Sequence, residues 1–330
     1  MKKYVLWISE VIVIIALLLV VNNYLGNQEL LIKADGKGYY DYLPATFLYH
    51  DLNFEYTDTL QTDYYDQKSY SAGYLKQVNG KQINKYFPGV SILWSPFFAC
   101  AHFYALESDY PADGYSYPYQ KAIFFAALFY LWLGLLYLRK LLTQFGTHPI
   151  VIFTIQLLFA LATPLLNYVQ YDPSFTHVYS FALITTFSFY GYNYLKNQKP
   201  IDLFIAALIL GLIIIIRPVN LISIGIPFLF LNSLNELKHD FKNLFTQHLS
   251  PIFKAILIFL SIVSIVPFLW WYQTGQFFIW GYQDEGFNFL SPAFTDFLFS
   301  ARKGAFIHTP LLFVAFLGGL FVWVKTKNYY

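Results

Sequence analysis

Long apolar runs separated by short polar connections dominate the 330 residues of this chain. A helix needs about 20 apolar residues to cross the hydrocarbon core of a bilayer. The runs lack the strict polar–apolar alternation of strands in a membrane β-barrel, so their backbone groups must pair within helices. The pattern predicts helical segments over 4–25, 88–107, 119–138, 149–168, 174–195, 201–216, 218–232, 252–273 and 305–324.

Lysines and arginines gather in a few connections between these runs, and cytoplasmic loops of membrane proteins collect such residues. The basic connections are Lys2-Lys3, Arg139-Lys140, Lys196 with Lys199, Lys238 with Lys242, and Lys325 with Lys327. These basic connections all lie on one side of the membrane only if 88–107 makes no net crossing. We therefore expect 88–107 to be a re-entrant or in-plane element. The alternative, a full crossing by 88–107, places Arg139, Lys140 and Lys196 outside.

The charge pattern therefore predicts an all-α polytopic membrane protein of about eight transmembrane helices. We expect one domain over 1–330, in the inner or plasma membrane, with a cytoplasmic N-terminus and the first apolar run retained as a helix. Two extracytoplasmic loops follow from this topology, over 26–118 and 274–304.

Local signals predict further structure in the first loop and at one helix pair. Residues 35–50 mix aromatic, aliphatic and charged types, as in a helix at the membrane surface. The segment from Tyr74 to Tyr86 has the pattern of a β-hairpin that turns at Asn79-Gly80. The two short runs around Arg217-Pro218 have basic flanks on both sides, which predicts a helical hairpin.

Composition supports a membrane protein and narrows its chemistry. Hydrophobic residues make up 57% and charged residues 12% of the chain, against about 25% charged in soluble domains. The net charge of +2 gives no case for a nucleic-acid partner, and one cysteine excludes a disulfide framework or thiolate metal cluster. The chain also lacks a phosphate-binding glycine loop, a paired-His motif and a nucleophile elbow, which disfavours a cytoplasmic nucleotide-sugar enzyme.

Three carboxylates are candidates for proton transfer on the outer side. Asp35 follows the first helix, and Gly36 and Gly38 come after it. A carboxylate there can accept a proton from a hydroxyl or amine. The alternative is a solvated acid that caps the next helix. Asp41 is a weaker candidate nearby. Asp172, before Pro173, is placed on the same side, where a functional role and a role as N-cap of the next helix are compatible interpretations.

Basic and aromatic residues complete the candidate site. Arg217 is the only charge between two very apolar runs, and its planar fork suits phosphate oxygens unless it merely snorkels to the interface. Arg302 and Lys303 are basic residues on the predicted outer side, whereas basic residues usually gather on the cytoplasmic side. They indicate either a phosphate site or a solvated loop. Tyr39 and Tyr40 suit sugar stacking or the ordinary aromatic belt, and His177 suits packing more than metal binding.

The chain resembles the GT-C glycosyltransferases, in particular glycosyltransferase family 39 with its protein O-mannosyltransferases, and the lipid A aminoarabinose transferase. The shared features are an acid after the first helix (Asp35), an aromatic, proline-containing re-entry (85–89), Asp172-Pro173, Arg217-Pro218, and a last outer loop over 299–310. The family often has an Asp-Glu pair where this chain has Asp35-Gly36, and its members are commonly longer.

This resemblance implies a function for the candidate residues. A polyprenyl-phosphate-linked sugar would be transferred with inversion to a lipid, glycan or protein acceptor of the cell envelope. Asp35 would be the general base with Asp172 near the same pocket, and the basic residues would hold the donor phosphate. No metal or cofactor is required, although a divalent metal stays open. The alternatives are a membrane transporter or lipid flippase, and a polymerase or ligase of surface polysaccharide.

Overall fold

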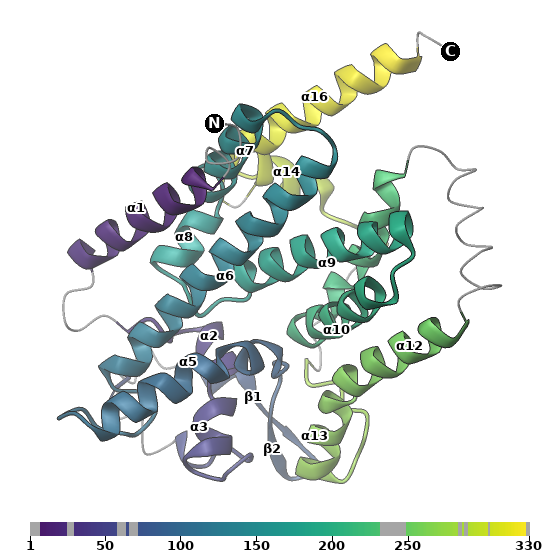
Figure 1. Cartoon of the computed structure of the whole chain (residues 1–330). Helices are drawn as coiled ribbons and strands as arrows, with labels where there is room; N and C mark the ends of the chain where they lie inside the picture. The colour runs from purple at the N-terminus through teal and green to yellow at the C-terminus, as the bar shows by residue number, and fades with distance from the viewer. Residues whose placement is uncertain are drawn as a thin grey trace.

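The computed structural model describes residues 7–24, 30–57, 64–65, 72–231, 249–282, 286, 290–302 and 304–327, and this part of the chain is mainly helical (Figure 1). The first half contains α1 (Ile8–Tyr24), α2 (Asp35–Tyr40), α3 (Tyr42–Phe47), η1 (Ala72–Tyr74), β1 (Leu75–Val78), β2 (Lys81–Asn84), α5 (Gly89–Leu106), α6 (Tyr117–Gln144) and α7 (Pro149–Leu161). The second half contains α8 (Leu165–Gln170), α9 (His177–Asn197), α10 (Pro200–Ile216), η2 (Pro218–Phe230), α12 (Leu249–Val263), α13 (Ile265–Thr274), α14 (Phe294–Phe299), α15 (Ala305–His308) and α16 (Pro310–Lys327).

Helices α1 and α6 run antiparallel, as contacts at both of their ends show. Near the start of α1, the Glu10 carboxylate accepts a 2.6 Å hydrogen bond from Nε of Arg139, which lies late in α6. After α1, the backbone N–H groups of Leu31 and Ile32 each donate to Oε1 of Gln120 at 2.9 Å, at the start of α6. The start of α1 therefore lies beside the end of α6.

The later helices alternate in the same way. A Cβ on Gly134 of α6 would lie 3.2 Å from Cα of Ala182, early in α9, and the Gln144 amide at the end of α6 donates to Oδ1 of Asn193, late in α9 (2.7 Å). Helices α6 and α9 therefore run parallel, and α7 connects them along the chain. The amide of Asn220, at the start of η2, donates to Oγ of Ser180 at the start of α9 (3.0 Å). The bundle thus has two ends, named here the Glu10 end and the Arg217 end.

The hairpin predicted from the sequence is confirmed. Strands β1 and β2 pair antiparallel with Val78 opposite Lys81, and the two turn residues Asn79 and Gly80 have φ values of 52° and 74°. Two consecutive residues at positive φ define the tight turn that matches the twist of paired strands. The helical hairpin around Arg217 is also confirmed, because α10 and η2 pack against each other.

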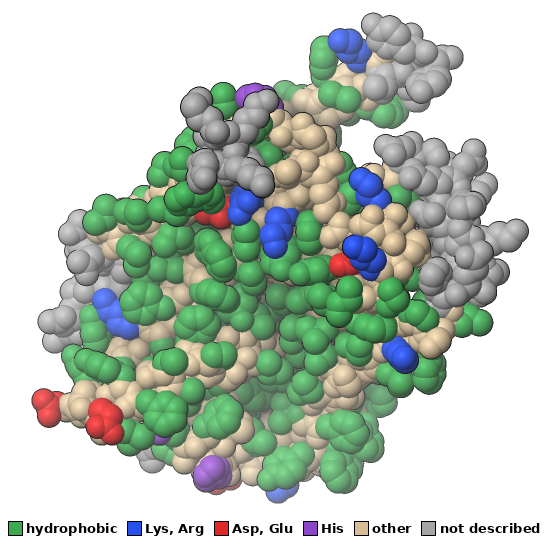
Figure 2. Space-filling model, in the orientation of Figure 1, with side chains coloured by type: hydrophobic (Ala, Val, Ile, Leu, Met, Phe, Trp, Pro, Cys, Tyr) green, Lys and Arg blue, Asp and Glu red, His purple; other side chains and the backbone are tan. Residues whose placement is uncertain are grey.

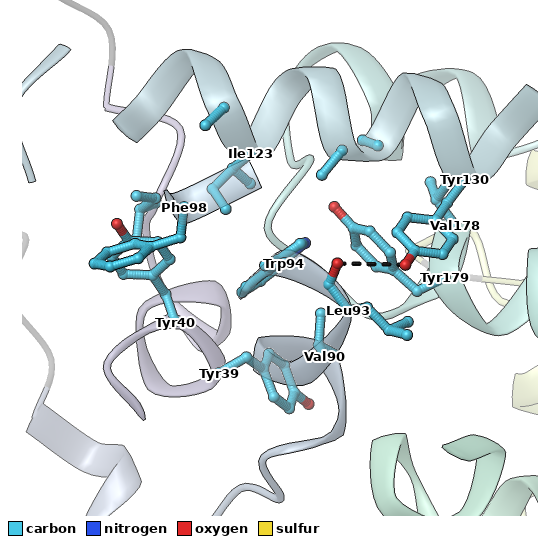
Figure 3. Close-up of a cluster of buried hydrophobic side chains, with 14 of the residues drawn as sticks. Tyr39, Tyr40, Val90, Leu93, Trp94, Phe98, Ile123, Tyr130, Val178 and Tyr179 are labelled. Carbon is cyan, nitrogen blue, oxygen red and sulfur yellow. Dashed lines mark hydrogen bonds between the residues drawn. The ribbon is translucent and has the colours of Figure 1, made fainter. Parts of the chain in front are cut away.

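The surface helix expected over 35–50 is different in the structure. Two short helices, α2 and α3, replace it, and residues 36–45 are buried rather than spread along one exposed face. Trp94 of α5 lies between them and the bundle, fully buried, with its ring 6.1 Å from Tyr40 and 5.4 Å from Tyr179 (Figure 3). This aromatic core fixes α2 against the Arg217 end of the bundle.

Apolar surface remains exposed on several helices, and Figure 2 shows a face dominated by hydrophobic side chains. By length and composition, three helical stretches of the described chain could cross a membrane: Gly89–Leu106, Tyr117–Gln144 and Leu249–Thr274. Most of α16 is exposed although it carries Phe313, Phe316 and Phe321. Such surface is costly in water and is readily covered by lipid. The described chain is therefore a helical membrane protein.

Candidate functional site

The carboxylate of Asp35 is exposed at the first residue of α2, and close packing holds that helix in place. A Cβ on Gly36 would lie 1.9 Å from Oγ of Ser174, so only glycine allows this approach. The Ser174 hydroxyl in turn donates to the backbone carbonyl of Leu31 at 2.8 Å. The segment before α2 is thereby joined to the loop between α8 and α9.

The second acid, Asp172, lies in that loop, so the structure brings the two predicted acids to the same end of the bundle. Its carboxylate is 3.4 Å from Nζ of Lys33 and accepts a 3.3 Å hydrogen bond from the Asn167 amide. The helix-capping interpretation of Asp172 is wrong, because α9 begins at His177 and its cap residue is Thr176. Asp172 is instead tied to the segment that carries Asp35.

Arg217 interrupts the helical path between α10 and η2 with an extended backbone (φ −152°, ψ 115°), and it is exposed. Its charge acts on the side chains of Tyr39 and His177, and the charge of Asp35 acts on the same two side chains. Arg217 also acts electrostatically on Tyr168, as does Asp172. The predicted cation and the two predicted acids therefore lie within electrostatic range of the same small group of side chains, Tyr39, Tyr168 and His177.

Two tyrosines form a wall beside Asp35. The rings of Tyr39 and Tyr86 are 4.4 Å apart, and both side chains are buried. Burial and a hydrogen bond to the Asp35 carboxylate raise the pKa of Tyr86, so its hydroxyl stays protonated as a donor. The Tyr282 ring, from the second long loop, meets Tyr86 edge-on at 6.3 Å.

Sequence reasoning missed Tyr86 and Lys33 as members of this site. Tyr86 stands beside Pro88 and Gly89, a segment interpreted only as a membrane re-entry, and Lys33 precedes Asp35 without any distinctive spacing. The pairing of Lys33 with Asp172 and of Tyr86 with Asp35 depends on how distant segments pack. No local signal in the sequence indicates either contact.

Asp41 and Tyr40 lie in the interior rather than at the exposed site. Asp41 is 0% exposed, and its carboxylate accepts hydrogen bonds from Lys37 Nζ (2.6 Å), from the Tyr115 hydroxyl (2.6 Å) and from the Tyr74 hydroxyl. Tyr40 is 0% exposed, and its hydroxyl donates to the carbonyl of Gly114. Both residues stabilise the packing of α2, and neither is placed to touch a substrate at the surface.

The remaining predicted site residues are His177, Arg302 and Lys303. His177 is the first residue of α9, and its ring stacks on Tyr168 with centroids 3.9 Å apart. Arg302 lies exposed on the turn after α14, and Lys303 lies outside the described residues, as do Lys2, Lys3, Lys238 and Lys242. Within the described ranges, no three His, Cys, Asp or Glu side chains come together as metal ligands.

An apolar groove of about 480 Å³ opens beside this site, between α7, α8, α9 and α16. Tyr168 and His177 stand at one part of its wall, and Phe181, Leu312 and Ala315 are among its other lining residues. The site therefore combines an exposed acid, an exposed cation, tyrosine rings and an adjoining apolar groove. No protein-family model, curated protein sequence or solved structure matches this chain.

Proposed function

We propose that this chain is a membrane glycosyltransferase of the GT-C type, which moves a sugar from a polyprenyl-phosphate donor to an acceptor at the extracytoplasmic face. The observation that carries the proposal is that Asp35 and Arg217 are both exposed at one end of the bundle. Close packing joins the segments around them, because a Cβ on Gly36 would lie 1.9 Å from Ser174 Oγ and a Cβ on Gly89 would lie 2.4 Å from the backbone of Ile215. An exposed carboxylate and an exposed guanidinium at the same end of the bundle offer a proton acceptor and a phosphate ligand.

The chemistry follows from these two groups. Asp35 takes the proton from an acceptor hydroxyl or amine as the acceptor oxygen or nitrogen bonds to the anomeric carbon. The bond from that carbon to the phosphate oxygen breaks on the opposite face, which inverts the configuration. Polyprenyl phosphate leaves, and Arg217 stabilises the charge that grows on it. Tyr86 and the Lys33–Asp172 pair hold the segment that carries Asp35.

The adjoining groove supports a lipid-linked donor. Its described walls are mainly apolar, with Phe159, Leu165 and Leu311 among them, and it begins beside the rings of Tyr168 and His177. An isoprenoid chain placed in the groove would leave its phosphate near Arg217, which acts electrostatically on both rings. A donor with one long apolar arm and one anionic group matches this division of the surface.

The proposed topology places the Arg217 end outside, with eight crossings and no net crossing by 88–107. The antiparallel arrangement of α1 and α6 supports it, because two consecutive crossings in opposite directions leave α5 on one side. In a Cys100→Ser background, we expect Lys33→Cys and Tyr171→Cys to react with a membrane-impermeant maleimide on intact cells. Thr143→Cys and Asn197→Cys should react only after permeabilisation, and labelling of Lys33→Cys and Tyr171→Cys from opposite sides would rule the topology out.

Binding of a polyprenyl phosphate tests the proposed role of Arg217. We expect the purified protein to bind the lipid and Arg217→Gln to weaken binding by about 10- to 100-fold, because a charge-assisted hydrogen bond to phosphate is lost. The matched control is Lys81→Gln, an exposed cation on β2. Equal affinity of Arg217→Gln and the parent would remove Arg217 from the phosphate site.

A transporter or flippase is the second candidate, and the same preparation separates it from a transferase. Vesicles that contain the protein and a polyprenyl-phosphate sugar should form glycosylated acceptor without a need for net lipid movement. Lipid movement without any glycosylated product would favour the flippase instead.

A further inference from the structure

We propose that the cavity between α9, α10, η2 and α12 is a binding site for an anionic phospholipid, with one acyl chain inside and the headgroup at the turn between α9 and α10. The headgroup end of this site lies at the Glu10 end of the bundle, opposite the end that carries Asp35 and Arg217, and the inference is independent of the proposed transferase activity.

The cavity has a volume of about 390 Å³, and its lining is apolar apart from one tyrosine. Gly191 on α9, Ala207 on α10, Leu221 and Pro227 on η2, and Phe259 on α12 are among the lining residues. A side chain at Gly191 would meet Pro227, since its Cβ would lie 2.6 Å from Pro227 Cγ. Glycine at this position therefore lets η2 approach α9, and the space between these helices and α12 accepts hydrocarbon rather than a water-soluble ligand.

The polar exception is Tyr194, which lines the cavity and is 3% exposed. Its hydroxyl has no hydrogen-bond partner within the described part of the chain. A buried hydroxyl without a partner costs free energy. In the proposed complex this hydroxyl donates to an ester carbonyl of the bound phospholipid.

Cations stand where the headgroup of such a lipid would lie. Leu195 and Leu203 line the cavity, and the turn between them carries Lys196 and Lys199, both exposed. Nζ of Lys196 lies 6.0 Å from the ring centre of Tyr192, a ring that also packs against Phe230 at the end of η2.

In the described part of the site, an acid lies close to this pair of lysines and a third lysine lies on the neighbouring helix. Lys199 acts electrostatically on Asp202, in the first turn of α10, and Lys254 is exposed on α12. Among the described residues around this turn the charge balance is positive, with three lysines against one carboxylate. Clustered lysines at the end of membrane helices attract anionic lipid headgroups by about tenfold or more in affinity. The occupant is therefore an anionic phospholipid rather than a zwitterionic one.

Thermal unfolding in a neutral detergent tests the site with two lipids that have the same acyl chains. Dioleoyl phosphatidylglycerol should raise the Tm by several degrees at concentrations about tenfold below those at which dioleoyl phosphatidylcholine acts. Ala207→Phe fills the cavity and should abolish the shift by either lipid. The matched control is Leu208→Phe, at a 40% exposed position beside it that does not line the cavity.

Charge variants separate headgroup recognition from chain binding. The double variant Lys196→Gln, Lys199→Gln should lose the preference for phosphatidylglycerol and respond to the two lipids alike, whereas Lys325→Gln on α16 should keep it. Native mass spectrometry of the same proteins gives a second readout, as retained phosphatidylglycerol. Equal shifts by both lipids in the parent protein, or an undiminished shift in Ala207→Phe, would overturn the proposal.

Discussion

Replacement of Asp35 with Asn is expected to reduce sugar transfer by about 10²- to 10⁴-fold, the usual contribution of a general base. Asparagine keeps the shape of the side chain but cannot accept the proton of an acceptor hydroxyl or amine. Asp35 is exposed at the start of α2, so the substitution leaves the packing of Gly36 against Ser174 intact. The measurement is transfer of a radiolabelled sugar from a polyprenyl-phosphate donor to membrane acceptors.

A matched comparison is available at Asp172, which lies at the same end of the bundle. Asp172→Asn removes the ion pair with Lys33 but not the proposed base. We expect a much smaller loss of transfer from this variant than from Asp35→Asn, while both bind polyprenyl phosphate like the parent. Full activity in a well-expressed Asp35→Asn protein would remove this residue from the mechanism, even if the chain proves to be a transferase.

The second large effect concerns stability and does not depend on the proposed function. Asp41→Asn should lower the free energy of unfolding by about 3–5 kcal/mol, because it removes a buried carboxylate that pairs with the buried Lys37 ammonium. The Lys37 and Asp41 side chains are only 4% and 0% exposed, and their charged atoms lie 2.6 Å apart. Rings of Tyr65, Tyr74 and Tyr115 surround the ammonium at 5.4–5.5 Å.

A double variant distinguishes loss of the charge pair from loss of shape. Lys37→Met combined with Asp41→Asn removes both charges and should recover much of the lost stability. The ion pair between Lys33 and Asp172 serves as the control, because its two side chains are 46% and 27% exposed. Asp172→Asn should therefore cost less than about 1 kcal/mol. Denaturant unfolding in detergent checks each value, and similar losses for Asp41→Asn and Asp172→Asn would contradict the assigned burial.

The candidate site was only partly accessible to prediction. Asp35, Asp172 and Arg217 could be selected because each is an isolated charge beside a turn signal or an apolar run, and charge in such a place is costly. Asp41 was selected as a weaker candidate because it lies close to Asp35 in the sequence, yet it accepts buried hydrogen bonds from Lys37 and Tyr115. Sequence context cannot separate an exposed acid from a buried one, since exposure depends on which distant segments cover it.

Glu10 gives a second example of a contact that only packing decides. The sequence leaves it as an isolated acid in the first apolar run. In the structure its carboxylate accepts hydrogen bonds from Arg139 on α6 and from the Gln156 amide on α7, which joins three helices. An acid in an apolar helix requires a partner, but the identity of that partner depends on how the helices are arranged.

The sequence by itself determined the helical membrane character, the turn at Asn79-Gly80 and the break at Arg217-Pro218, because hydropathy and backbone preference are properties of neighbouring residues. Only the tertiary structure decided that Tyr86 faces Asp35, that Lys33 pairs with Asp172, and that Asp41 is buried. Those outcomes depend on close approach between segments far apart in the chain, such as Gly36 against Ser174. Packing geometry, rather than local composition, sets which charges meet.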